Sequence, residues 1–247
     1  HLTKIITDNK LLIKIKEIIE KVKVAILPLG AVEAHGPHLP LGTDNYLSEK
    51  IAEKLSENVE CLVFPTLPYG QVWSLEEFPG SVSLSNETLI NMLYEIGKSM
   101  YKNGFKIFGI INGHLGNGTA IKEAQRKLFS EFSDFKTFNF FYTGTDKVIQ
   151  EVRETQKLHK NYFHADELET SYMLYLADEY VEMSKAINGN PDYPEYIDIT
   201  PVRWTEFTDT AVMGDATLAT KEKGKKIVDT AVKNMSDIIK KTLEEIK

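Results

Sequence analysis

Side chains that could bind a metal ion or move a proton gather in three short segments of the sequence. The first, GAVEAHGPHLPLGTDN at 30–45, contains Glu33, His35, His38 and Asp44. Glu33 and His35 are two positions apart, so in an extended turn they lie on one side and can reach one centre or two adjacent ones. Imidazole and carboxylate are donors that zinc, manganese and iron(II) accept. We therefore expect a metal site here rather than an ordinary polar loop.

The second segment, IINGHLGNG at 110–118, places Asn112, His114 and Asn117 among three glycines. A glycine-rich turn that opens a helix can also cradle phosphate. The segment lacks the Lys-Ser/Thr ending of a P-loop and the GxGxxG spacing of a dinucleotide turn. We therefore interpret His114 as a metal ligand.

The third segment, FHADELETS at 163–171, places His164, Asp166, Glu167 and Glu169 where a helix is expected to begin. Carboxylates in a first helical turn are favoured by the helix dipole whatever their function. If the helix includes His164, that residue and Glu167 share a face and could project into one site.

The sequence offers no convincing nucleophile. The single cysteine, Cys61, lies inside an apolar run and is expected to be inert core. The GxSxG elbow of α/β-hydrolases is absent. Metal-activated water is the attacking group that remains.

The elements that must position these side chains alternate between helix and strand. Apolar spacing predicts helices over 9–21, 45–57, 86–102, 118–132, 167–176 and 218–247, and buried strands over 22–30, 61–65, 106–112 and 136–142. This alternation predicts an α/β fold with a mostly parallel sheet covered on both faces. Ligands then collect at the carboxyl ends of the strands, where the first two segments emerge.

Two stretches carry less regular patterns. Residues 66–83 are rich in Pro, Gly and Trp and are expected to form a functional loop. Residues 188–210 could be a linker, but their aromatic side chains favour an ordered excursion. We expect the whole chain, 1–247, to form a single domain.

Composition narrows the possible partners. With 36 acidic and 29 basic residues the formal charge is -7, which argues against nucleic acid. No apolar run is long enough to span a bilayer, and no signal-like segment precedes the first helix. One cysteine among 247 residues fits a cytoplasmic location.

Five stretches together resemble the creatininase (creatinine amidohydrolase) family. They are LPLGAVEAHGPHLPLGTDN, FPGSVSL at 78–84, INGHLGN, HADELETS and GDATLATKEKG at 214–224, in the family's order. The resemblance implies a three-layer α/β/α sandwich, a homohexamer built as a trimer of dimers, and two divalent metal ions, with Zn, Mn and Fe(II) all acceptable. Glu33 and His114 would bind one ion, His35 the other, and Asp44 would bridge both. His164 matches the family's general base or proton shuttle.

The sequence departs from creatininase proper at two places. A Glu that binds the second ion there is replaced by Gly116. We expect Glu167 to supply this acid, as a metal ligand and catalytic residue, and Glu169 to orient a ligand or catalytic group. The aromatic residues that cover creatinine are also absent. Trp73, Asn117 and Tyr142 are our candidates for substrate binding, and Trp204, like Trp73, could be a lid or part of the core.

The implied activity is hydrolysis of a small, cyclic amide C–N bond by a metal-bridging hydroxide, with His164 protonating the departing nitrogen. A formamide hydrolase or a cofactor-maturation peptidase of the same family is the alternative. A third possibility is a non-catalytic oligomer with a degenerate metal site.

Overall fold

A four-stranded parallel sheet forms the centre of the computed structural model, which describes residues 12–156, 159 and 162–246. The strand order is β2–β1–β3–β4, with bounds β1 (Val24–Leu29), β2 (Leu62–Val63), β3 (Ile107–Asn112) and β4 (Lys136–Phe140). Every residue of the two central strands is buried, which explains why their sequences are almost continuously apolar.

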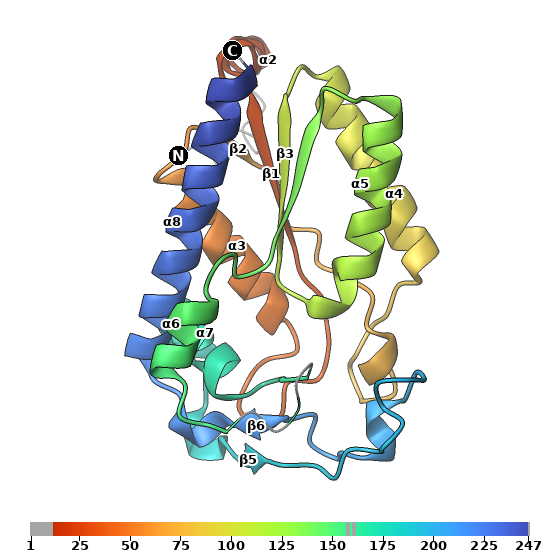
Figure 1. Cartoon of the computed structure of the whole chain (residues 1–247), viewed down its shortest axis with the longest axis vertical. Helices are drawn as coiled ribbons and strands as arrows, with labels where there is room; N and C mark the ends of the chain where they lie inside the picture. Colours follow the sequence, from red (N-terminus) through yellow and green to blue (C-terminus); the bar gives the residue numbers. More distant parts are fainter. Residues whose placement is uncertain (1–11, 157–158, 160–161, 247) are drawn as a thin grey trace.

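Helices cover both faces of this sheet (Figure 1). On one face lie α3 (Thr43–Ser56), α7 (Glu167–Leu176) and α8 (Lys221–Ile246). On the other lie α4 (Asn86–Lys102) and α5 (Gly118–Glu131), with Ile19 of α2 (Leu12–Lys21) packed against the same core. The predicted three-layer α/β/α architecture with a parallel sheet is therefore confirmed.

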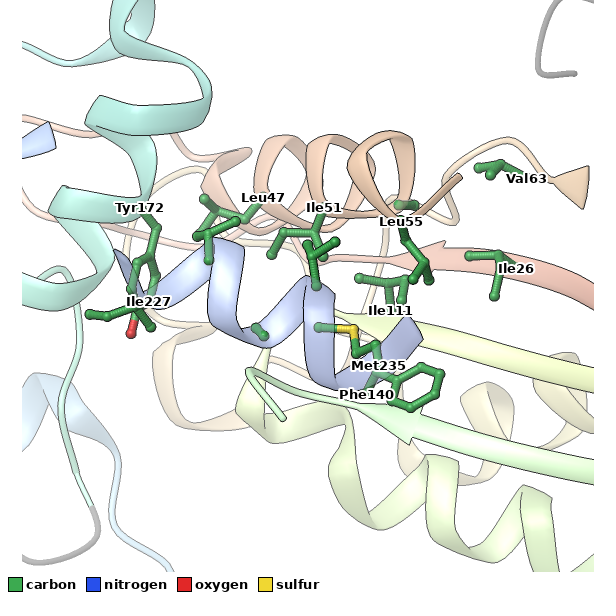
Figure 2. Close-up of a cluster of buried hydrophobic side chains, with 14 of the residues drawn as sticks. Ile26, Leu47, Ile51, Leu55, Val63, Ile111, Phe140, Tyr172, Ile227 and Met235 are labelled. Atoms are coloured by element: carbon green, nitrogen blue, oxygen red, sulfur yellow. The ribbon is translucent and has the colours of Figure 1, made fainter. Parts of the chain in front are cut away.

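The core between the sheet and the first of these layers shows how sequence spacing becomes packing. Leu47, Ile51 and Leu55 of α3 are four residues apart and point together toward the sheet, where Ile26 and Ile111 meet them (Figure 2). Side chains at this spacing share a helix face. Replacing one of these leucines by alanine would cost about 2–5 kcal/mol of folding free energy.

The ends of several elements differ from their sequence-based expectations. The strand expected over 61–65 is only two residues long, and residues 9–11 of the first expected helix lie outside the described residues. Helix α6 (Asp146–Val152) and an antiparallel ribbon of β5 (Asn188–Gly189) with β6 (Gly214–Asp215) were not expected. Both are too short for a hydrophobic period to reveal them.

Residues 66–83 and 188–212 pass over the end of the sheet at which the strands finish. The first contains the 3₁₀ turn η1 (Trp73–Leu75), and the second contains η5 (Trp204–Glu206). The two loops share a small apolar core that includes Val72, Leu75 and Trp204, so residues 188–210 are an ordered excursion. None of the helices within the described ranges is long and apolar enough to span a membrane.

Candidate metal centre

Three parts of the chain meet beyond the carboxyl ends of β1 and β3. Glu33 and His35 follow β1, and Asp44 lies in the first turn of α3. His114 follows β3 after Gly113, where a Cβ atom would lie 2.3 Å from the Asp44 carbonyl oxygen. Glycine therefore lets the chain after β3 pass directly against the start of α3.

The third part is the start of α7, which brings His164 and Glu169. The backbone of His164 pairs with Met213 in an isolated antiparallel bridge, and Asp166 caps α7 by accepting hydrogen bonds from the amides of Leu168 and Glu169. The carboxylate of Glu169 accepts a 2.7 Å hydrogen bond from the Ala165 amide. These contacts fix both side chains relative to the helix.

Asp44 lies between two imidazoles. Its Oδ1 is 3.3 Å from Nε2 of His35, and its Oδ2 is 3.5 Å from Nδ1 of His114. Glu33 Oε1 lies 3.0 Å from His114 Nδ1, and Glu169 Oε2 lies 3.6 Å from His35 Nε2. One carboxylate oxygen thus faces each half of the cluster, as a ligand shared by two ions would require.

The three imidazoles are oriented in the same way. His35 donates from Nδ1 to the Glu33 carbonyl at 3.0 Å, His114 from Nε2 to the Gln71 carbonyl at 2.7 Å, and His164 from Nε2 to the Ala34 carbonyl at 2.7 Å. A carbonyl oxygen can only accept, so each of these nitrogens carries a proton. The other nitrogen of each ring faces the carboxylates, which is how metal-binding histidines are usually held.

The cluster is buried and its polar atoms are not satisfied by hydrogen bonds. Both carboxylate oxygens of Glu33, Nε2 of His35 and Oδ2 of Asp44 have no hydrogen-bond partner among the described residues. Such atoms are costly to bury unless something else binds them. The donors also form three sets, each compact enough to hold a metal ion: Glu33–Asp44–His114, His35–Asp44–Glu169 and Glu33–His35–His164. The residues present therefore fit two neighbouring cations.

Burial and mutual charge shift the pKa values of these groups in the metal-free protein. Burial raises the pKa of Asp44, and the neighbouring Glu33 carboxylate raises it further, to about 7. Burial opposes the charged form of Glu33 too, but His114 outweighs it and lowers the pKa to about 2. Burial and the nearby His35 lower the pKa of His164, which favours its neutral form. A cation would replace the proton on Asp44, so metal binding is coupled to proton release.

A cavity of about 140 Å³ opens onto this cluster. Its polar side is formed by the side chains of the cluster, which are Glu33, Asp44, His114, His164 and Glu169. The walls are mainly apolar or aromatic, and are formed by Val72, Leu75, Leu115, Phe141, Tyr162, Phe163 and Trp204, with Gln71 and Ser74 as polar exceptions. A mostly apolar pocket with a few convergent polar groups is typical of small-molecule sites.

Glu167 does not enter the cluster, contrary to our expectation. Its carboxylate accepts hydrogen bonds from the amides of Glu154 and Thr155 and lies 2.5 Å from Nζ of Lys223. The expectation of a shared face assumed that His164 and Glu167 belong to one helix. Ala165 instead has φ 46° and α7 begins only at Glu167, so the two side chains do not share a face. Glu169, expected only to orient a ligand, takes this place.

The three residues expected to bind substrate are not among those that line the cavity. Asn117 is fully buried and holds the backbone, accepting from the Gln71 amide and donating to the Gly30 carbonyl. Tyr142 stacks on Tyr172 with ring centroids 4.3 Å apart, and Trp73 lies beneath Arg203. The aromatic wall comes instead from Phe141, Tyr162, Phe163 and Trp204.

His38 also lies outside the three donor sets. Its Nε2 is 2.8 Å from the hydroxyl of Thr170 on α7. Burial is the main reason that its pKa falls to about 4, so this imidazole is neutral at pH 7. It belongs to the packing between the 30–45 segment and α7.

Comparison with known proteins identifies the family. The Creatininase model, described as creatinine amidohydrolase, matches residues 13–239. The chain belongs to the creatininase family. The family's model spans all three segments that supply the cluster, and the resemblance seen in the sequence is confirmed.

Individual relatives in this family carry several activities. Creatinine amidohydrolase of Pseudomonas putida is 29% identical over 88% of each chain. 3-Dehydro-scyllo-inosose hydrolase of Thermotoga maritima is 27% identical over 94% of this chain and 81% of its own. Mycofactocin precursor peptide peptidase of Mycolicibacterium smegmatis is 28% identical over 89% of this chain and 85% of its own. All three are named as hydrolases or peptidases, so the creatininase-family chain is a hydrolase.

Solved structures agree with this fold and family. A manganese form of creatininase superposes with a TM-score of 0.83 at 27% identity, covering 94% of this chain and 96% of the other. A mutant creatininase of the Zn-Zn type superposes with a TM-score of 0.84 at 26% identity, covering 94% and 95%. Both names report metal ions in those proteins.

Proposed function

We propose that this creatininase-family chain is a metal-dependent amidohydrolase that cleaves a small, cyclic amide C–N bond. The observation that carries the proposal is the placement of Asp44, with one oxygen toward His35 and the other toward His114, in a buried cluster that one nitrogen of each imidazole faces. The manganese and Zn-Zn forms of creatininase, which share this fold, support the proposal.

The donor sets suggest how two ions would be held. Glu33, Asp44 and His114 would hold one, and His35, Asp44 and Glu169 the other. Zn, Mn and Fe(II) all accept this mixture of nitrogen and oxygen donors. Bound divalent ions lower the pKa of water toward neutrality and polarise a carbonyl oxygen, which is the chemistry an amide hydrolase needs.

His164 is the residue placed to move a proton. Its Nδ1 lies 3.8 Å from both Glu33 Oε1 and Glu169 Oε2, on the cavity side, while Nε2 is fixed by the Ala34 carbonyl. As a neutral base it would accept a proton at Nδ1 and pass it to the leaving nitrogen, since an unprotonated amide anion leaves poorly. Because Nδ1 also belongs to a possible ligand set, His164→Gln separates the roles: a shuttle variant keeps its metal and loses turnover.

The test of the proposal is metal content together with turnover. His114→Ala or Asp44→Asn should reduce bound metal, measured by plasma mass spectrometry, and abolish hydrolysis. His38→Gln is the matched control, because this buried imidazole lies outside the donor sets and should leave metal content unchanged. Full metal content and activity in the Asp44 and His114 variants would refute the assignment.

Peptide or formamide hydrolysis is the alternative within the same family. The peptidase relatives favour a peptide substrate, whereas the mostly apolar cavity of about 140 Å³ favours a small molecule. A panel of lactams, formamides and short peptides, assayed with Zn²⁺, Mn²⁺ or Fe²⁺, distinguishes the substrates. Absence of bound metal and of turnover across this panel would support the non-catalytic interpretation.

We also infer, from the family resemblance and composition, a cytoplasmic homo-oligomer, specifically a hexamer formed as a trimer of dimers, with the whole chain as one domain. Light scattering coupled to gel filtration measures the assembly, and a monomer at micromolar concentration would contradict it. The negative formal charge remains the argument against nucleic acid.

A further inference from the structure

Part of the cavity wall comes from two loops that are far apart in the sequence. Val72, Ser74 and Leu75 line it from the 66–83 loop, and Trp204 lines it from the 188–212 loop. The indole of Trp204 meets the His164 ring edge to face, with centroids 5.2 Å apart and planes at 76°. Trp204 is thus an aromatic wall in direct contact with the proposed proton shuttle.

Arg203 joins these two loops. Its guanidinium lies 3.9 Å from the centroid of the Trp73 ring, and Nη1 is 2.7 Å from Oε1 of Glu76. Nη1 also donates to the Trp73 carbonyl oxygen. Next to it, the Thr205 hydroxyl donates to the Glu77 carboxylate. These contacts run from residues 203–205 to residues 73–77 of the other loop.

The excursion that carries Trp204 is also held by the small apolar core that it shares with the 66–83 loop. The β5–β6 ribbon closes its base through two residue pairs, Asn188 with Asp215 and Gly189 with Gly214. Between these pairs, the turn at 203–206 is closed by its own hydrogen bonds, from the Glu206 amide to the Arg203 carbonyl and from the Arg203 amide to the Glu206 carboxylate. Arg203, the chain neighbour of Trp204, therefore adds polar and cation–π contacts between this turn and the 66–83 loop to the apolar packing of the indole.

We propose that Arg203 is a positioning residue: by stacking on Trp73 and pairing with Glu76 it holds Trp204 as a cavity wall, and so limits the size of the non-reacting part of the substrate. This inference rests on the proposed function of the adjoining metal centre. Among the described residues no Lys or Arg lines the cavity, and Arg203 itself is engaged with Trp73 and Glu76. The substrate that fits is a compact amide without a negatively charged substituent.

The first experiment needs neither metal nor substrate. Because the chain has two tryptophans, Trp73→Phe leaves Trp204 as the only indole and keeps an aromatic ring beneath Arg203. Adding Arg203→Ala should shift the Trp204 emission to longer wavelength and increase its quenching by acrylamide. Arg126→Ala, which removes an exposed Arg–Glu pair on α5, is the matched control and should change neither. Unchanged emission in the Arg203 variant would overturn the proposal.

The second experiment uses hydroxamates, whose chelating group binds metal centres whatever the natural substrate is. The metal-loaded wild type should bind acetohydroxamate and discriminate against 2-naphthohydroxamate. Arg203→Ala should reduce this discrimination roughly three- to thirtyfold, the range expected for loss of a cation–π contact. Arg203→Lys, which keeps the charge but not the planar stacking, should lie between the two.

The outcomes distinguish the proposed role of Arg203 from the proposed metal-dependent function on which it rests. If metal-loaded wild-type protein does not bind acetohydroxamate, the metal centre is wrong, and Trp204 emission still decides the role of Arg203. If Arg203→Ala weakens both hydroxamates equally, Arg203 supports the fold without controlling size, and the proposal is wrong. Should Arg203→Ala fail to fold, Arg203→Lys carries both measurements.

Discussion

Gly116 lies tightly against the ring of His114. A Cβ atom at this position would be 2.4 Å from Nε2 of His114 and 2.6 Å from the carbonyl oxygen of Gln71, the two atoms whose hydrogen bond turns Nδ1 toward the cluster. An acidic side chain therefore cannot be accommodated at 116 with this backbone. Glu169, which approaches His35 from α7, is the carboxylate that completes the cluster instead.

At this scale we predict that Gly116→Ala weakens metal binding. The new methyl group must push His114 away from Gln71, and loss of such an orienting hydrogen bond weakens metal affinity about 10- to 100-fold. Metal titration monitored by calorimetry measures the effect. Gly118→Ala is the control, because among the described residues nothing lies within 4 Å of a Cβ there. Equal affinity in both variants would contradict this account of Gly116.

At the scale of elements, α7 is held from behind by a second buried polar network. Lys223 of α8 bridges Glu167 and Glu154 and donates to the Leu218 carbonyl oxygen, while Arg153 pairs with Asp166 at 2.8 Å. At Gly224, a Cβ atom would lie 1.9 Å from the Ser171 carbonyl oxygen, so α7 and α8 touch backbone to backbone. The first turn of α7, which presents Glu169, is therefore fixed from its far side.

We expect Lys223→Met to lower the free energy of unfolding by about 3 kcal/mol, because it leaves the Glu167 carboxylate buried without its cation. Burial alone would raise the pKa of Glu167, but hydrogen bonds, first of all from Lys223 and then from Thr155 and the backbone amides, together lower it. A lowered folded-state pKa stabilises the protein above the unfolded value, and that stability is lost as the pH falls. The difference in free energy of unfolding between the variant and the wild type should therefore become smaller below about pH 4.

Urea unfolding from about pH 2.5 to pH 8 measures both effects. Lys225→Met is the control, since its pair with Asp229 lies on the exposed face of the same helix and should contribute less than about 1 kcal/mol. Equal losses in the two variants would show that Lys223 adds nothing beyond surface charge.

Much of this arrangement could be predicted from the sequence, because β1 and β3 have unmistakable apolar patterns and parallel strands end at one edge of a sheet. Glu33, His35 and His114 follow those ends within a few residues, and Asp44 opens the next helix. The sequence could not predict whether Glu167 or Glu169 enters the cluster, because this depends on the unusual backbone conformation of Ala165. The sequence also could not predict that Trp204 contacts His164, because no periodic pattern connects residues 40 positions apart.

At the scale of the whole molecule, bound metal would tie the segments after β1 and β3 to the start of α7. We predict that chelation with EDTA lowers the melting temperature as well as abolishing turnover. Ligand at 100 times its dissociation constant adds about 2.7 kcal/mol, which corresponds to roughly 5–10 °C for a chain of this size. Differential scanning calorimetry measures the shift.

His114→Ala protein, which lacks a proposed ligand, provides the comparison for this prediction. It should melt at nearly the same temperature with and without EDTA. A wild-type protein that is equally insensitive would argue against structural coupling between metal and fold.

The cluster residues lie on segments that directly follow strands of the sheet or begin α3 and α7, whereas Ser74, Leu75 and Trp204 lie in excursions outside the four strands of the sheet. Substitutions in those excursions can therefore accumulate without displacing the side chains of the metal centre. Divergence toward new substrates, by natural selection or in a laboratory library, should be concentrated at the mouth of the cavity, while the inherited chemistry persists unaltered.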